Sequence, residues 1–182
     1  MAHGTVLYRG PSLLDGSPIV VIATLSSKNR KTGELVQTWI LRDDMDPIKA
    51  VATGADSGIC GDCVHRGTSN DGKGRSCYVT YFQGPNAVYK AYKNGSYKLP
   101  VSALEGRVVR FGSYGDPAAV PFDVWAAVAK GATGWTGYTH QWRKIDPKYA
   151  GICMASADSE SDRVLAKSMG YRTFRVRSAN DP

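Results

Sequence analysis

Apolar runs in the first part of the chain are short and lie between polar, turn-forming segments. Residues 19–24 form a β-branched run and residues 35–41 form a second apolar run, with the polar segment 29–33 between them. This pattern predicts two strands paired as a hairpin. Residues 1–18 are rich in glycine and proline and are interpreted as a surface lead-in. Asp46, Pro47 and Gly54 mark the cap, the first turn and the end of a short helix.

Strand-like and helix-like segments alternate along the rest of the chain. Strands are predicted at residues 78–82, 108–111, 135–142, 152–155 and 173–176, and helices at residues 85–92, 121–130 and 159–169. This alternation, with helices of modest length, favours parallel βαβ units with right-handed crossovers. We therefore predict an α/β fold: a mostly parallel open sheet or a partial βα barrel, with an N-terminal hairpin and a metal-binding loop.

Composition narrows the class of protein. The 182 residues are enough for one domain, 1–182, with a core that needs no disulfides. No apolar run is long enough to span a bilayer, and the start has no signal-peptide pattern, so we expect a cytoplasmic protein without a membrane partner. The net charge of +7 favours a polyanionic partner such as a nucleotide or a nucleic acid.

Three cysteines form the most specific motif in the sequence. Cys60 and Cys63 have the C-x2-C spacing, and Cys77 follows after thirteen further residues of polar, glycine-rich chain. In a reducing compartment, closely spaced cysteines are typical of metal sites, and free thiols are the alternative. The segment 57–80 is therefore predicted to be a metal-binding loop.

The fourth ligand and the metal remain open at this point. His65 is the expected fourth ligand, and Cys153 and Asp62 are alternatives. Three thiolates and a histidine are typical of structural zinc, whereas three cysteines alone also suit an iron–sulfur cluster with one free iron.

Polar residues follow several predicted strands, where function gathers in parallel α/β folds. Asp116, His140 and Asp158 are the candidate catalytic residues, with His140 expected to transfer protons and the carboxylates to orient or support a metal. Each also has a structural interpretation: Asp116 as a turn residue, Asp158 as a helix cap, and His140 as a hydrogen-bonded structural histidine.

Four further residues near the same strand ends are predicted to bind substrate. They are Tyr114, Gln141, Arg175 and Arg177. If the sheet is parallel, they share one edge with the candidate catalytic residues.

Several short strings carry a resemblance to a known family. With Cys-Gly-Asp-Cys at 60–63, Gly-Ser-Tyr-Gly-Asp-Pro at 112–117 and Gly-Tyr-Thr-His-Gln-Trp at 137–142, the chain resembles a family of uncharacterised bacteriophage and prophage proteins. The resemblance covers about residues 19–177 and implies a viral origin and a bacterial host cytoplasm.

A second resemblance is to radical S-adenosylmethionine enzymes. These have a three-cysteine cluster loop before a βα series and a Gly-Glu-Pro-like turn, to which residues 115–117 are similar. Their cluster motif is C-x3-C-x2-C, which differs from the C-x2-C-x13-C of this chain. The resemblance implies a partial barrel and an iron–sulfur cofactor.

Two functions follow from these observations. The first is a phage-type metal-binding enzyme that acts on a nucleotide or nucleic acid at the strand-end edge. The second is a non-catalytic phage factor with structural zinc that binds a host protein or a nucleic acid. A redox role for Cys60 and Cys63 is less favoured, because the motif does not follow a strand and open a helix.

Overall fold

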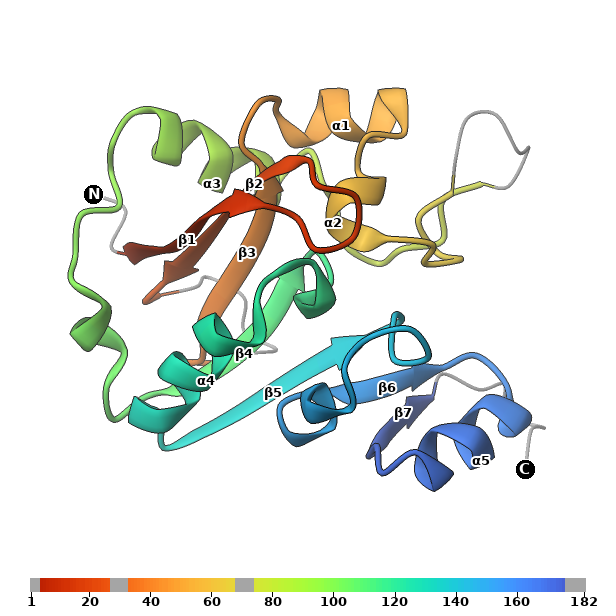
Figure 1. The fold of residues 1–182 in the computed structure, drawn as a ribbon. Helices are drawn as coiled ribbons and strands as arrows, with labels where there is room; N and C mark the ends of the chain where they lie inside the picture. The colour runs from red at the N-terminus through yellow and green to blue at the C-terminus, as the bar shows by residue number, and fades with distance from the viewer. Residues whose placement is uncertain (1–3, 27–32, 68–73, 176–182) are drawn as a thin grey trace.

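The computed structural model describes residues 4–26, 33–67 and 74–175 (Figure 1). Its centre is one open sheet of seven strands in the order β1-β2-β3-β4-β5-β6-β7. The strands β3 to β7 are parallel, and β1 to β3 are antiparallel. The α/β class and the mostly parallel sheet are thus confirmed.

The antiparallel part consists of β1 (Gly4–Pro11), β2 (Pro18–Thr24) and β3 (Val36–Arg42). Strands β2 and β3 form the predicted hairpin pair, while the expected turn at 29–33 lies outside the described residues except for Gly33. The interpretation of residues 1–18 as a lead-in is wrong, because β1 pairs with β2. A register shift between Val6 and Tyr8 interrupts the two-residue alternation that marks a strand in sequence.

The parallel part continues with four strands along the chain. They are β4 (Val108–Tyr114), β5 (Gly134–Thr139), β6 (Met154–Ala157) and β7 (Thr173–Arg175). Each lies at or near a predicted strand. The predicted strand at 135–142 ends at Thr139, so the polar residues after it lie at the carboxyl edge of the sheet.

Five α-helices and three short 3₁₀ segments are found among the described residues. The helices are α1 (Pro47–Thr53), α2 (Ser57–Cys60), α3 (Gly84–Lys93), α4 (Phe122–Gly131) and α5 (Glu160–Ser168). The 3₁₀ segments are η1 (Val101–Leu104), η2 (Pro117–Ala119) and η3 (Pro147–Gly151). Helix α1 has the predicted cap, because the Asp46 carboxylate accepts the backbone N–H groups of Ile48 and Lys49.

The predicted strand at 78–82 is not formed. These residues are turns, bends and unassigned backbone that lead into α3, with Tyr78 76% exposed and Phe82 54% exposed. Their β-forming residues match strand propensity, but propensity is decided by packing against a neighbouring strand, and these two side chains are not packed. Cys77 consequently lies in a loop.

A buried carboxylate joins three elements at the end of β3. The Asp43 carboxylate accepts hydrogen bonds from Arg9 of β1 (2.6 Å) and from Tyr92 (2.9 Å) and Lys93 (3.3 Å) of α3. Burial alone would raise the pKa of Asp43, but these hydrogen bonds outweigh it and hold the pKa below its ordinary value.

The main core lies between the sheet and its helices. Phe111 of β4 packs on Trp125 of α4, with ring centroids 4.9 Å apart, and both side chains are fully buried. A smaller cluster around Trp142 and Tyr171 fills the space near α5. Within the described residues, no helix is both long enough and apolar enough to cross a bilayer.

Candidate functional site

Two imidazoles and one carboxylate meet at the carboxyl edge of β5 and β6. His65 Nε2 lies 3.2 Å from Asp158 Oδ1, and His140 Nε2 lies 3.9 Å from the same oxygen. The two imidazole rings meet edge to face, with centroids 5.4 Å apart. One potential metal-ligand atom of each residue lies within 4.8 Å of those of the other two. Among the described residues, no other three His, Cys, Asp or Glu side chains come this close together. We call it the His-His-Asp cluster.

His140 is placed by the end of β5 and by Asp116. Its backbone N–H donates to Asp116 Oδ2 (2.8 Å), while Asp116 Oδ1 accepts the N–H of Ala118 (2.9 Å) at the start of η2. Burial raises the pKa of Asp116 to about 6, although these N–H groups and the Thr139 hydroxyl favour the ionised form. Since both oxygens are engaged with backbone, Asp116 is placed to position His140.

Asp158 directly follows β6, and its side chain does not cap helix α5. Ser159 is the N-cap of α5, because its Oγ accepts the N–H of Asp162 (3.1 Å). The Asp158 carboxylate instead points at the two histidines. The predicted helix cap is thus formed by Ser159, and the carboxylate of Asp158 is left facing the histidines.

His65 is oriented from both sides of its ring. Its Nδ1 lies 2.9 Å from Ser76 Oγ, opposite the contact of Nε2 with Asp158. Its carbonyl also accepts the N–H groups of Ser76 (3.2 Å) and Cys77 (2.9 Å), which closes the base of the cysteine loop. No pattern in the sequence points to Ser76, because its contact with His65 arises only in the folded loop.

The electrostatics of the site favour a neutral imidazole at His140. Burial lowers the pKa of His140, and the neighbouring His65 lowers it further, while Asp158 acts in the opposite direction. A neutral imidazole is the form that binds a metal ion.

The three loop cysteines lie beside this cluster. Burial raises the pKa of the Cys60 thiol well above its usual range, and the negative charges of Asp56, Cys63, Asp116 and Cys77 add to the rise. Burial likewise raises the pKa of Cys63 to about 11, although the His65 N–H opposes the shift. The thiols of Cys60 and Cys63 are therefore protonated at neutral pH unless a cation is close.

The two alternative fourth ligands have other surroundings. Cys153 is buried in the main core, where its sulfur packs over Gly137. Asp62 stands between Cys60 and Cys63 in the chain, but its carboxylate forms an ion pair with Lys144 at the surface. The ring of His65, the expected fourth ligand, faces His140 and Asp158.

A buried acid anchors both ends of the cysteine loop. Asp56 is fully buried, and its carboxylate pairs with Arg66 (3.5 Å) and Arg75 (3.2 Å), which stand at the two sides of the loop. Arg75 also donates to the Arg66 carbonyl (3.0 Å). Sequence reasoning missed this network, because nothing in the residue pattern pairs an acid with bases so far along the chain.

The predicted substrate-binding residues are spread around the edge. Tyr114 is buried, and its hydroxyl has no hydrogen-bond partner among the described residues. Gln141 is buried and donates from Nε2 to the Cys60 carbonyl (3.2 Å), so it ties β5 to α2. Arg175 pairs with Glu160 of α5 (2.8 Å), and Arg177 lies outside the described residues.

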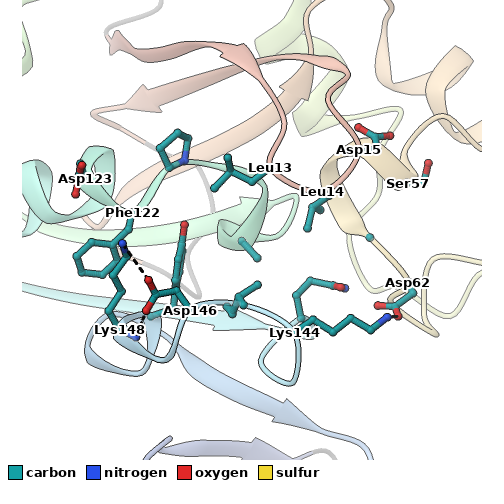
Figure 2. Close-up of a pocket in the computed structure, with 16 residues that line it drawn as sticks. Leu13, Leu14, Asp15, Ser57, Asp62, Phe122, Asp123, Lys144, Asp146 and Lys148 are labelled. Carbon is teal, nitrogen blue, oxygen red and sulfur yellow. Dashed lines mark hydrogen bonds and ion pairs between the residues drawn. The ribbon is translucent and has the colours of Figure 1, made fainter.

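A cavity of about 700 Å³ is lined by none of the three cluster residues (Figure 2). Its lining includes Gly61, Asp62 and Gln141, together with Phe122 and Tyr149. Ion pairs of Lys144 with Asp62 and of Lys148 with Asp146 occupy its rim. The His-His-Asp cluster therefore lies outside this cavity.

Comparison of the chain with models of protein families, with curated proteins and with solved structures gives no match. The resemblances to phage proteins and to radical S-adenosylmethionine enzymes stay predictions. The function has to be argued from the geometry of the site.

Proposed function

We propose that the chain is a metal-dependent enzyme, that His65, His140 and Asp158 hold its ion, and that its substrate is a nucleotide or a nucleic acid. One observation carries the proposal. Three separate segments of the chain bring two imidazoles and a carboxylate within 4.8 Å of one another at the carboxyl edge of a parallel sheet. This edge is where active sites of such folds gather.

The donor set fits a catalytic rather than a closed site. Two histidines and one carboxylate leave coordination positions open for water or substrate, as in catalytic zinc sites. The same set also suits non-haem iron(II). Zinc is the ion of this proposal, and when bound it would supply a Lewis acid for a phosphoryl or carbonyl oxygen.

The surrounding residues are suited to hold such a ligand set. In one tautomer of His65, Nε2 donates a hydrogen bond to Asp158 and Nδ1 accepts one from the Ser76 hydroxyl. In the other tautomer, Nδ1 donates a hydrogen bond to Ser76, and the lone pair of Nε2 is left to bind an ion. Asp116 fixes the backbone of His140 from within the fold. In this arrangement His140 serves as a ligand, in place of the proton-transfer role inferred from sequence, and Asp116 serves as a positioning residue.

The cysteines support a second, alternative cofactor. Thiolates on one zinc ion would stand about 3.8 Å apart, since each Zn–S bond is about 2.3 Å long in a tetrahedron. Within the described residues the three thiols do not form a group with all atoms inside 4.8 Å. Wider spacing suits an iron–sulfur cluster on Cys60, Cys63 and Cys77, which is the alternative we keep.

The charge of the chain supports the substrate class. A net charge of +7 attracts polyanions, and phosphate esters are substrates on which a Lewis acid acts directly. The alternative, a phage factor with structural zinc, predicts binding of a host protein or nucleic acid without turnover.

Elemental analysis with an absorption spectrum, on protein purified without oxygen, tests the assignment. We expect one zinc per chain, lost in His140→Ala and in Asp158→Ala. His3→Ala is the matched control and should keep its zinc. Zinc retained in both site variants would overturn the proposal, and zinc lost only in Cys60→Ser would assign the ion to the cysteines. Iron with sulfide and a brown colour would establish the cluster.

Turnover is then measured on zinc-loaded protein with nucleotides and short oligonucleotides, separated by chromatography. Hydrolysis that disappears in His140→Ala and persists in His3→Ala supports the enzyme. Binding of oligonucleotides with no turnover under any metal would leave the non-catalytic factor.

A further inference from the structure

One face of the parallel half of the sheet carries the helices. Phe111 of β4 packs on Trp125 of α4, and Arg175 of β7 reaches Glu160 of α5. Residues that alternate with these along their strands must point to the opposite face.

The strand register identifies the opposite face. Arg110 lies beside Thr136, Tyr138 beside Met154, and Ser156 beside Phe174 in neighbouring strands. Lateral neighbours in parallel strands point the same way, and so do residues two apart within a strand. Contact between the Tyr138 and Phe174 rings, whose centroids are 4.8 Å apart, confirms that β5 and β7 share this face. We call these six residues the aromatic face.

The aromatic face is exposed at Phe174, is half-buried or buried at its other residues, and extends toward the cysteine loop. Phe174 is 44% exposed, and Tyr138 is half-buried beside it. Tyr78, which follows Cys77, accepts a hydrogen bond from Arg110 (2.5 Å) and is the most exposed aromatic residue of the described chain. The Arg110 Nε has no hydrogen-bond partner among the described residues.

The aromatic face ends next to the candidate site, because His140 and Asp158 are the first residues after β5 and β6. His140 follows two residues after Tyr138, and Asp158 follows two residues after Ser156. A ligand lying along the aromatic face therefore ends at the His-His-Asp cluster. The six residues of the face include a guanidinium and no carboxylate.

We propose that the aromatic face binds single-stranded nucleic acid and presents it to the His-His-Asp cluster. Bases stack on Tyr138, Phe174 and Tyr78, and Arg110 contacts the phosphates, as aromatic residues on an open sheet do in single-strand binding modules. The net charge of +7 complements the phosphate backbone. A duplex is excluded from this mode, because its bases are already stacked on one another. The inference deepens the proposed function, since it names the form of the substrate and the surface that holds it.

Fluorescence anisotropy with a labelled single-stranded oligonucleotide of about 12 nucleotides, at low salt, tests the surface. Phe174→Ala and Tyr78→Ala change exposed side chains, so the fold is retained. We expect each to weaken binding by roughly fivefold to 150-fold, the effect of losing one stacked base. Leu165→Ala, at a residue 46% exposed on α5 of the helix-bearing face, is the matched control and should bind like the unmodified chain.

Equal affinity of the unmodified chain and both aromatic variants would overturn the inference, as would duplex binding as tight as single-strand binding. Zinc content separates this result from the proposed function. Phe174→Ala should keep its zinc while losing affinity, and His140→Ala should lose zinc while still binding the oligonucleotide. Loss of oligonucleotide binding in Leu165→Ala to the same extent would also refute the surface assignment.

Discussion

The buried carboxylate under the cysteine loop allows a quantitative prediction. Asp56 is fully buried, and the side chains of its partners Arg66 and Arg75 are only 12% and 16% exposed. Burial raises the pKa of Asp56, while the two guanidinium groups act against the rise, so the carboxylate and the arginines depend on one another for charge compensation. Asp56→Asn removes the charge and keeps the shape, and it leaves two cations in a poorly solvated site.

The expected loss is large for a single isosteric change. Breaking a buried pair by removing one partner costs about 3–5 kcal/mol. The Asn amide oxygen still accepts one N–H from Arg75, so the lower end, about 3 kcal/mol, applies. For a chain of this size, that loss lowers Tm by roughly 6–12 °C.

Urea unfolding in the presence of a chelator measures this loss without any contribution from metal. Asp62→Asn is the matched control, because it lies in the same loop and both side chains of its ion pair with Lys144 are exposed, Asp62 by 59% and Lys144 by 67%. A surface pair contributes about 0–1 kcal/mol, so this variant should unfold almost like the unmodified chain. An Asp56→Asn variant within about 0.5 kcal/mol of Asp62→Asn would refute the idea that the network anchors the loop.

Three further predictions concern the rest of the fold. Three hydrogen-bond donors hold the pKa of Asp43 below its ordinary value, so the stability that this carboxylate contributes is present above about pH 4. That stability is lost as the pH falls through the pKa of Asp43 in the folded state. Urea midpoints measured across acid pH should therefore depend less on pH in Asp43→Asn than in the unmodified chain. In urea unfolding, Gly115→Ala should lower the free energy of unfolding by about 1–3 kcal/mol more than Gly16→Ala. Both glycines have a positive φ, 80° at Gly115 and 77° at Gly16. Only at Gly115 would the new Cβ clash, because it would lie 2.7 Å from Cβ and 2.9 Å from the carbonyl oxygen of Ile40 in β3. Ser159→Ala should cost about 1 kcal/mol through loss of the α5 cap and leave the zinc content unchanged, and a loss of zinc would contradict the separate role of Asp158.

The regular elements were predictable where one local signal was sufficient. The β-branched run of β2 and the capped helix α1 appear where the pattern placed them. Strand β1 was not recognised, because its register shift breaks the alternation between Val6 and Tyr8. Propensity alone predicts a strand at 78–82, but this segment pairs with no strand among the described residues, and only Val79 and Tyr81 pack on the main core.

The candidate site was predictable only in part. The position of polar residues after β5 and β6 predicted that His140 and Asp158 meet at one edge, and they do. His65 was placed with the cysteines because they are close in sequence. The direction of the His65 ring depends on the conformation of the cysteine loop. The ion pairs of buried Asp56 with Arg66 and Arg75 stabilise that conformation, and no sequence pattern predicts them.

The arrangement couples the proposed metal site to the fold. The ligands come from the cysteine loop, the end of β5 and the end of β6, so the unfolded chain holds them far apart. An ion that binds only the folded chain stabilises it by RT ln(1 + [L]/Kd), and at about a hundredfold excess over Kd this is about 2.7 kcal/mol. That gain is similar to the expected loss in Asp56→Asn. The Asp56 ion pairs and the proposed zinc ion therefore stabilise the same loop, the first through Arg66 and Arg75 and the second through His65. We expect zinc to restore part of the stability that Asp56→Asn loses.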